Sequence, residues 1–160
     1  MSIAYLGLGS NIGPKENIAS AMRALKADFD RTWFSPLYRS PAVGLEGGDF
    51  INLVAGVETA LHPLDLKHYL HELEDRHNRD RNMPKWSSRT LDIDILLYDD
   101  LYLVSPALEI PRKEILDMAH VLKPLADIAA DLVHPVEGET MDQLWLGFRS
   151  KTPKHGLVTL

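Results

Sequence analysis

Two aspartates, Asp92 and Asp94, interrupt an otherwise apolar run over residues 91–98. The run is rich in β-branched and large apolar residues, which is typical of a β-strand. Side chains alternate between the two faces of a strand, so one face would carry Leu91, Ile93, Ile95 and Leu97. Asp92 and Asp94 would share the other face, roughly 6.6 Å apart at ~3.3 Å of rise per residue.

Two neighbouring carboxylates on a half-buried surface repel each other. Burial of such a pair without a partner would cost several kcal/mol, or it would force one carboxyl group to take up a proton. A hard divalent cation is the simplest compensation, and ligation by oxygen alone favours Mg²⁺. The alternative is a solvated strand face on which both aspartates are simply hydrated.

Five cationic residues stand directly upstream of the aspartates. They are Arg76, Arg79, Arg81, Lys85 and Arg89. Only Asp80 opposes them, so this segment has a formal charge of +4, whereas the whole chain has a net charge of −6. A basic cluster beside two carboxylates suits a polyphosphate with bound Mg²⁺, because guanidinium groups can hold the phosphate oxygens that the metal leaves.

Length and composition restrict the classes of protein that this chain could represent. With 160 residues, 45% hydrophobic and 25% charged, it is most simply one globular domain. The sequence has no cysteine, which excludes disulfides and thiolate metal sites and fits a cytoplasmic protein. Residues 1–5 lack the pattern of a signal peptide, and no apolar run approaches ~20 residues. The acidic balance argues against a nucleic-acid binder. We expect a monomer that has neither membrane nor nucleic-acid partners.

Local patterns predict the elements that position the charged residues. We expect strands at 3–8, 32–38, 50–59 and 89–98, and helices that open at Pro14 and at Pro63, the second fraying near Asn78. This β-α-β-β-α-β order predicts an α+β fold, a ferredoxin-like sandwich of four antiparallel strands with helices packed on one face. The other face would stay open for a site.

The remainder of the chain is less regular. A short apolar segment at 101–104 precedes a helix through Leu125, Ile128 and Ala129. We expect one domain over residues 1–149 and a flexible C-terminal tail over residues 150–160, because the tail is polar and contains glycine.

Three blocks of residues follow one another over roughly residues 1 to 135. Gly9-Ser10-Asn11 follows the first strand, Tyr38-Arg39-Ser40-Pro41 precedes Phe50-Ile51-Asn52, and Trp86 precedes Arg89-Thr90-Leu91-Asp92-Ile93-Asp94. In the order and spacing of these blocks the chain resembles the 6-hydroxymethyl-7,8-dihydropterin pyrophosphokinase family. The fold of that family is the α+β sandwich that the element order predicts.

The resemblance implies an ATP-dependent diphosphotransferase of folate biosynthesis. Such an enzyme moves the β,γ-pyrophosphoryl group of ATP to the hydroxymethyl group of a reduced pterin and releases AMP. Asp92 and Asp94 would hold two Mg²⁺ ions that bridge the ATP phosphates and stabilise the attacking and leaving oxygens. By the same resemblance, Arg79, Arg81 and Arg89 complete the catalytic set on the phosphate side.

The resemblance also implies a slot for each substrate. Asn52 would read the edge of the pterin ring through its amide, with Phe50 as one stacking face. Ser40 stands where the family usually has a threonine. The rest of the ring edge would be completed by Pro41, Ala42 and Val43. On the nucleotide side the resemblance implies contacts from His71, Glu74, Lys85, Trp86, Ile95 and Leu108.

Each of these residues also has a simpler interpretation. Phe50 could belong to the core, Asn52 could end a loop, and Arg79 and Arg81 could be solvated charges at a helix end. His71 could be a surface residue, and neutral imidazole is a poor ligand for Mg²⁺.

Three positions in one segment depart from the family pattern. Arg112 stands where a histidine usually contacts an ATP phosphate, and its guanidinium could make the same contact with a permanent charge. Met118 replaces a usual arginine. His120 replaces a phenylalanine that usually forms the second face of the pterin slot, and imidazole can stack with less area and a pH-dependent charge.

These departures leave alternative functions open. The chain could be a paralogue that acts on a modified pterin, or a module on the same fold that binds a nucleotide without turnover. A module that only binds a nucleotide would not require two carboxylates poised for a metal, so Asp92 and Asp94 argue against it. A metal-dependent nuclease would need further carboxylates near the pair and a broader basic surface.

Overall fold

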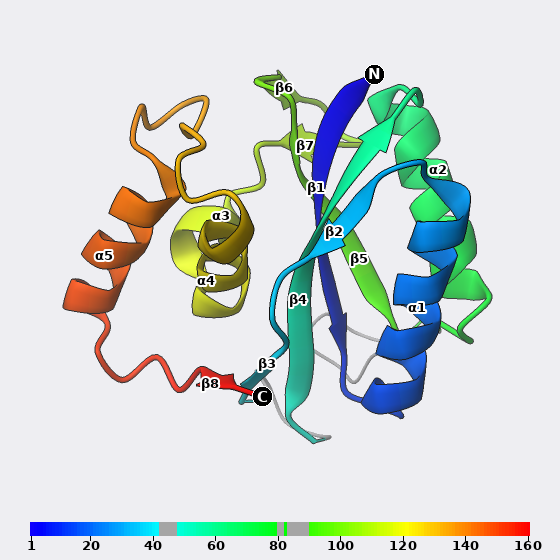
Figure 1. Cartoon of the computed structure of the whole chain (residues 1–160), viewed down its shortest axis with the longest axis horizontal. Coiled ribbons are helices and arrows are strands. Elements are labelled where there is room, and N and C mark those ends of the chain that lie inside the picture. The colour runs from blue at the N-terminus through cyan, green and yellow to red at the C-terminus, as the bar shows by residue number, and fades with distance from the viewer. Residues whose placement is uncertain (42–47, 80–81, 83–89) are drawn as a thin grey trace.

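A computed structural model describes residues 1–41, 48–79, 82 and 90–160 of the chain. A twisted antiparallel sheet runs through the middle of the molecule, and helices cover both of its faces (Figure 1). The fold class that the sequence predicts, an α+β sandwich with an antiparallel sheet, is confirmed.

Six strands form the main sheet in the described part of the chain. They are β1 (Ser2–Ser10), β2 (Thr32–Phe34), β3 (Tyr38–Ser40), β4 (Phe50–Thr59), β5 (Asp92–Tyr98) and β8 (Val158–Thr159). Their order is β5-β1-β4-β3-β8, and β2 pairs with β4 beside β3. The central strands pair antiparallel from Ser2 opposite Thr59 to Ser10 opposite Ile51. A separate ribbon consists of β6 (Leu103–Val104) and β7 (Glu109–Ile110).

The strand expected at residues 32–38 is divided into β2 and β3, so the prediction of four strands is corrected. Pro36 lies in the break, where it has no N–H to donate to a neighbouring strand. Ser35 bridges the interruption, because its backbone N–H donates to the Val54 carbonyl oxygen at 2.9 Å and its Oγ accepts from the Val54 N–H at 2.9 Å.

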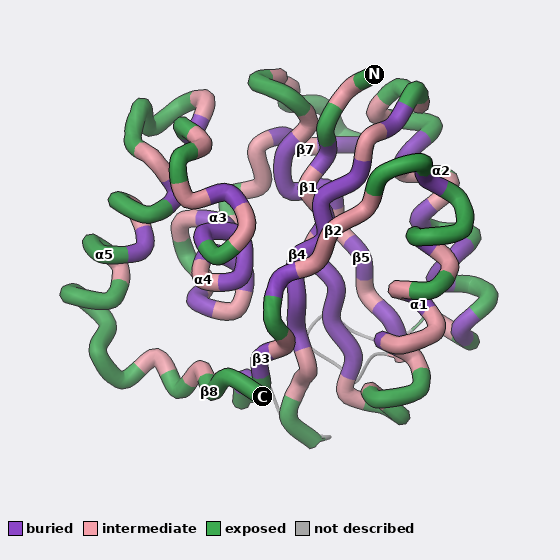
Figure 2. The backbone as a smooth tube through the Cα atoms, viewed as in Figure 1, coloured by how far each residue is buried: buried purple, intermediate pink, exposed green. Residues whose placement is uncertain are grey.

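Helices α1 (Pro14–Asp28) and α2 (Pro63–Asp75) pack on one face of the sheet, and both begin at the proline that the sequence indicated. Leu6, Leu53 and Ile93 from the strands pack with Leu25 of α1 and Leu70 of α2 in one buried core. Figure 2 shows buried positions concentrated in the central strands, while α1 and α2 carry buried, intermediate and exposed positions along their length.

The expectation of an open second face is wrong for the part of the sheet that α3–α5 cover. Helices α3 (Glu114–Asp117), α4 (Ala119–Ile128) and α5 (Met141–Lys151) lie on that side, and Leu122 and Leu125 of α4 pack with Val54 and Leu96 of the sheet. These strand residues are apolar and must be buried. The polar ends of the same strands stay uncovered, and they form one wall of a cleft.

The alternation predicted along β5 fails at Leu97. The pairing with β1 places Leu6 opposite Ile95 but Tyr5 opposite Leu97, so Leu96 is an extra residue at a bulge. Leu97 therefore joins the second core instead of the core of α1 and α2. Asp92 and Asp94 precede the bulge, and both line the cleft on the second face as predicted.

The end of the chain returns to the sheet. α5 extends to Lys151, and β8 pairs with β3, with Thr159 opposite Tyr38 and Val158 opposite Arg39. Leu160 N–H also donates to the Leu37 carbonyl oxygen at 3.0 Å. The boundary at residue 149 and the flexibility of the tail stay predictions.

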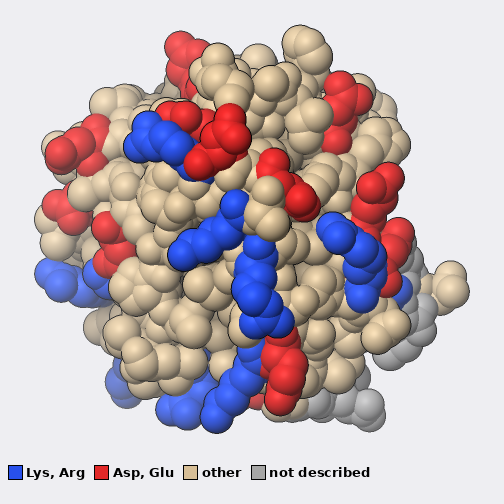
Figure 3. Space-filling model, turned by 45° about the vertical axis from the view of Figure 1, so that its right-hand side comes forward, with Lys and Arg blue, Asp and Glu red and all other residues tan. Residues whose placement is uncertain are grey.

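Acidic and basic side chains are mixed on the face shown in Figure 3, where the described residues form no broad basic surface. The described helices are also too short or too polar to cross a membrane.

Candidate active site

A cleft of about 280 Å³ lies between the ends of β1, β4 and β5 and the helices α3 and α4. Nine of the residues expected at the site line it: Ser40, Pro41, Phe50, Asn52, Arg79, Asp92, Asp94, Arg112 and His120. Residues far apart in the sequence therefore meet in one place, as the resemblance implied.

The two aspartates form the floor of the cleft with two glycines of the neighbouring strand. Gly7 pairs with Asp94 and Gly9 pairs with Asp92 across β1 and β5. Neither glycine carries a side chain, so Asn52 Nδ2 can lie over Gly9 and the side chain of Leu96 can lie over Gly7. Both aspartates line this cleft from the same strand, which is the shared face that their spacing in the sequence predicted.

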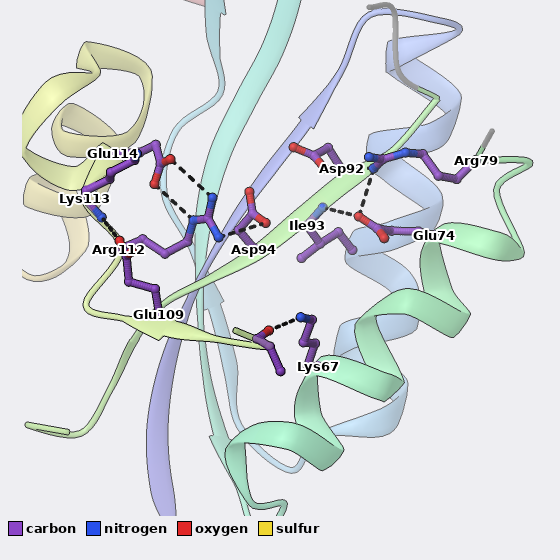
Figure 4. Close-up of polar contacts among 11 residues, drawn as sticks. Lys67, Glu74, Arg79, Asp92, Ile93, Asp94, Glu109, Arg112, Lys113 and Glu114 are labelled. Atoms are coloured by element: carbon purple, nitrogen blue, oxygen red, sulfur yellow. Dashed lines mark hydrogen bonds and ion pairs between the residues drawn. The ribbon is translucent and has the colours of Figure 1, made fainter. Parts of the chain in front are cut away.

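Each aspartate faces a different arginine (Figure 4). Arg79 Nη1 donates to Asp92 Oδ1 at 2.8 Å, and Arg112 Nη1 lies 3.7 Å from Asp94 Oδ1. Burial, followed by repulsion from Asp92, raises the pKa of Asp94 to about 7, although Arg112 opposes the shift. The Asp94 carboxylate is therefore short of positive charge, and a cation that binds it would relieve this deficit.

Glu74 lies behind Arg79 and is almost fully buried. Its Oε2 accepts from Arg79 Nη1 at 3.1 Å and from the Ile93 N–H at 2.8 Å. Arg79 Nη1 also donates to the Leu91 carbonyl oxygen at 3.0 Å. Glu74 therefore ties the end of α2 to β5 and fixes the guanidinium beside Asp92. The family resemblance implied a nucleotide contact for Glu74, and that contact stays a prediction.

Arg112 enters the cleft from the opposite side. Its Nε and Nη2 donate to Glu114 Oε2 at 3.2 Å and Oε1 at 3.3 Å, and its backbone N–H donates to the carbonyl oxygen of Leu96 at 3.0 Å. Burial lowers the pKa of Arg112, but the carboxylates of Asp94 and Glu114 outweigh this effect and raise it. The position that departs from the family pattern thus carries a firmly held permanent cation.

Ser40 and Asn52 form a buried polar pair at the end of the cleft nearest β3. Ser40 Oγ donates to Asn52 Oδ1 at 2.7 Å, which fixes the orientation of the amide. The amide nitrogen lies over Gly9, where an added Cβ would come within 2.8 Å of Asn52 Nδ2. Gly9 therefore leaves the room that Asn52 occupies, and the amide nitrogen is held as a donor.

Phe50 and His120 also line the cleft, Phe50 from the start of β4 and His120 from α4. Burial lowers the pKa of His120, although Asp92 and Glu114 oppose this shift. The imidazole is therefore neutral at neutral pH, and a neutral ring can stack on a flat heterocycle.

A second hollow of about 400 Å³ adjoins the cleft, and Asp94 and Arg112 line both. Three more of the residues expected on the nucleotide side, His71, Ile95 and Leu108, line this second hollow. Lys67 of α2 also lines this hollow, and its Nζ donates to the carbonyl oxygen of Ala107 (Figure 4).

Six expected site residues lie outside the described part of the chain: Ala42, Val43, Arg81, Lys85, Trp86 and Arg89. Sequence reasoning also missed some described residues of the site. Glu114 and Lys67 gave no signal of their own, because each is a single charge on a helix. Gly7 and Gly9 could have been found from their alternation in a strand, where glycine often marks close packing or an approach to a ligand.

The donor set of the cleft fits a hard cation. Asp92 and Asp94 offer only oxygen, which suits Mg²⁺. Among residues 1–41, 48–79, 82 and 90–160, no three His, Cys, Asp or Glu side chains are grouped so that they could hold a metal. A cation on this pair would take its remaining ligands from phosphate oxygens or water.

Comparison with known families gives a match over residues 5–130, to the family of 7,8-dihydro-6-hydroxymethylpterin-pyrophosphokinase (HPPK). The chain is 39% identical over 144 residues to the 2-amino-4-hydroxy-6-hydroxymethyldihydropteridine pyrophosphokinase of Pseudomonas aeruginosa, with 88% of each chain covered. It is also 40% identical over 134 residues to the bifunctional protein FolKE of Lactococcus lactis, with 80% of this chain and 38% of that protein covered.

Solved structures show the same fold. The wild-type HPPK-DHPS of Plasmodium falciparum matches with a TM-score of 0.74 at 15% sequence identity. The match covers 96% of this chain and 42% of that chain. The chain thus spans less than half the length of these two larger proteins.

Proposed function

The chain belongs to the HPPK family, and from this membership we propose that its cleft transfers pyrophosphate from ATP to 6-hydroxymethyl-7,8-dihydropterin in folate biosynthesis. The observation that carries the proposal is the meeting of two kinds of site in one cleft. Asp92 and Asp94 lie beside Arg79 and Arg112 at one end, and the Ser40–Asn52 pair lies at the other.

Asp92 and Asp94 would hold the Mg²⁺ ions, two of them by resemblance to the family. The raised pKa of Asp94 and the oxygen-only donors support this assignment. When bound, the metal neutralises charge on the phosphate oxygens.

Arg79 and Arg112 bind the remaining phosphate oxygens, because a guanidinium group presents paired donors to an oxyanion. Glu74 holds Arg79 against β5, so that this cation needs little reorganisation when the nucleotide binds. We assign Arg81, Arg89, Lys85 and Trp86 to the same side by family resemblance.

The pterin lies flat between Phe50 and His120. Asn52 donates from its amide nitrogen to an acceptor on the ring edge, while Ser40 keeps the amide in this orientation. By family resemblance we assign Pro41, Ala42 and Val43 to the same edge. Recognition of the pterin ring therefore depends on the amide nitrogen of Asn52, a buried donor whose orientation is already fixed before the substrate binds.

The adenine lies in the second hollow, against Ile95 and Leu108 with His71 at its wall. This arrangement places the nucleotide across Asp94 and Arg112, which both spaces share. The triphosphate would then cross from the second hollow into the cleft.

In the reaction the hydroxymethyl oxygen forms a bond to the β-phosphorus, and the bond from that phosphorus to the α,β-bridging oxygen breaks. AMP leaves with the bridging oxygen, and the hydroxyl proton passes to solvent. The residues of the cleft contribute mainly by positioning the hydroxyl group and by stabilising the charge of the phosphate oxygens.

One assay tests the proposal directly. The protein is incubated with ATP, Mg²⁺ and 6-hydroxymethyl-7,8-dihydropterin, and the nucleotide products are separated by chromatography. We expect AMP and a diphosphorylated pterin in equal amounts. Formation of ADP would instead indicate an ordinary kinase, and no nucleotide product would refute the proposal.

We also propose that the chain acts as a monomer in the cytoplasm, without nucleic-acid partners. The absence of cysteine supports the cytoplasm. Size-exclusion chromatography with light scattering should give a mass of 18.0 kDa. A mass of twice this value would indicate a dimer.

A further inference from the structure

Arg112 is held by two carboxylates in different ways. Glu114 accepts from its Nε and Nη2 at 3.2 and 3.3 Å, a paired contact, whereas Asp94 Oδ1 lies 3.7 Å from its Nη1 (Figure 4). The first contact is a pair of hydrogen bonds, and the second is a longer charge contact. Arg112 can therefore leave Asp94 without leaving Glu114.

The charges of the described cleft do not balance. Arg79 pairs with Glu74 and Asp92, and Arg112 pairs with Glu114 and Asp94. These four described carboxylates and two guanidinium groups together have a formal charge of −2. One divalent cation would neutralise this group, and until it binds Arg112 is the cation that faces Asp94.

Glu114 determines how closely Arg112 approaches Asp94. Without the Glu114 carboxylate, Asp94 would be the acidic side chain left to this guanidinium among its described ion pairs. Arg112 would then move onto Asp94 and compete with a metal ion for the same oxygens. Glu114 keeps the guanidinium set back, so that the carboxylate stays open.

We infer that Glu114 is a positioning residue, which holds Arg112 as a resident counter-cation of Asp94 and keeps it out of the metal position. When a divalent cation takes Asp94, the guanidinium turns to the phosphate oxygens of the nucleotide while Glu114 still holds it. This inference rests on the proposed function for the identity of the nucleotide, but the exchange at Asp94 can be tested without turnover.

The main test is a double-mutant cycle on cation binding without nucleotide, with Mn²⁺ as a paramagnetic substitute for Mg²⁺. We expect Glu114→Gln to weaken Mn²⁺ binding about 10-fold, because Arg112 closes on Asp94. In an Arg112→Met background the same substitution should change binding less than about 2-fold. Equal losses in both backgrounds would overturn the inference, since Glu114 would then act on the cation through its own charge.

Asp117→Asn is the matched control. Asp117 is exposed on the same short helix, α3, and its substitution removes the same negative charge. We expect Mn²⁺ binding to change less than about 2-fold, because exposed charges are well screened. If Asp117→Asn weakened Mn²⁺ binding as much as Glu114→Gln does, the effect would come from the overall charge of the helix. This outcome would contradict the inference.

Steady-state kinetics give a second readout. Glu114→Gln should raise KM for ATP about 5- to 10-fold, with less than about 2-fold change in KM for the pterin, since only the phosphate contact of Arg112 is displaced. Glu114→Asp keeps the charge and should recover most of the loss. A parallel rise of both KM values with a lower melting temperature would indicate a merely structural role and refute the inference.

The two proposals fail in different ways. If the wild-type protein forms no AMP, the proposed function is wrong, but the Mn²⁺ cycle still decides the role of Glu114. If AMP forms and the cycle shows no coupling between Glu114 and Arg112, the function stands and this inference is wrong.

Discussion

Asp94 is the residue on which the proposed chemistry of the cleft depends most. Its pKa of about 7 reflects burial first and repulsion from Asp92 second, and Arg112 offsets these effects only in part. A carboxylate in such an environment destabilises the folded protein unless a cation binds, so we expect function and stability to oppose each other here.

The substitution Asp94→Asn should separate the two effects on activity and stability. We expect AMP formation to fall at least ~10²-fold, because a ligand of the metal is lost. The metal-free protein should become more stable by about 1 kcal/mol, or ~2–4 °C in melting temperature. The full shift would correspond to about 4 kcal/mol, but 40% of the side chain is exposed, so screening by solvent reduces the effect.

This gain in stability should depend on pH. The pKa of Asp94 is raised from 3.8 to about 7, so the folded protein loses stability as pH rises between these values. The stability gained by Asp94→Asn should therefore be greatest above pH 7 and small near pH 4. Melting curves of both proteins from pH 4 to pH 8 measure it, and an equal gain at every pH would contradict the assigned pKa.

Gly9 provides a test of the proposed pterin end of the cleft. A Cβ at this position would lie 2.8 Å from Asn52 Nδ2, so Gly9→Ala should displace the amide from Ser40. We expect KM for the pterin to rise about 10-fold or more, as for a lost buried hydrogen bond, with a smaller effect on KM for ATP.

Gly147→Ala is the control for this substitution. Gly147 lies in α5, where an added Cβ meets nothing within 4 Å, so both KM values should stay unchanged. The protein should become more stable by ~0.5–1 kcal/mol, because alanine favours the helix. If Gly9→Ala also left KM for the pterin unchanged, the assignment of Asn52 would be wrong.

At the scale of elements, the position of the short strand β3 is set by its neighbours. The Tyr38 hydroxyl group donates to Asp127 of α4, and Asp127 also accepts from Lys123 Nζ at 2.8 Å. Burial, followed by the interaction with Asp127, raises the pKa of Tyr38, so its hydroxyl group stays protonated and remains a donor. This contact joins the strand that carries Ser40 to the helix that carries His120.

Tyr38→Phe should lower the free energy of unfolding by about 1–2 kcal/mol, because a buried hydrogen bond to a carboxylate is lost. Denaturation with urea measures the change. Tyr102→Phe removes a hydroxyl group from a side chain that is 66% exposed and should have no measurable effect. Equal stability of both variants would show that this contact does not anchor β3.

At the scale of the whole molecule, the C-terminal segment connects the second core to the sheet. Leu157 packs against the second core, His155 contacts Trp145 of α5, and Thr159 pairs with Tyr38. The tail therefore adds a strand to the edge of the sheet at β3.

Deletion of residues 153–160 should lower the melting temperature by ~2–6 °C, because apolar contacts and strand pairing are lost together. Leu157→Ala should reproduce part of this loss, since it removes only the packing. A melting temperature unchanged by the deletion would support the flexible tail that the sequence predicts.

The local parts of this protein follow from its sequence. The prolines at 14 and 63 mark the first residues of both helices, and alternation places Asp92 and Asp94 on one face of β5, because neighbours along the chain decide both features. The family membership follows equally, since the spacing of motifs is a property of the chain. The order of elements follows too, except that the strand predicted at 32–38 is divided into β2 and β3.

Tertiary structure alone decided what depends on contacts between distant segments. The bulge at Leu96 reverses Leu97, α3–α5 cover part of the second face, and Arg112 with its neighbour Glu114 meets Asp94 of β5. No local pattern encodes these outcomes, because each depends on which surfaces remain to be buried after the sheet has formed. The sequence thus determined which chemical groups are present, and packing determined which of them hold one another in place.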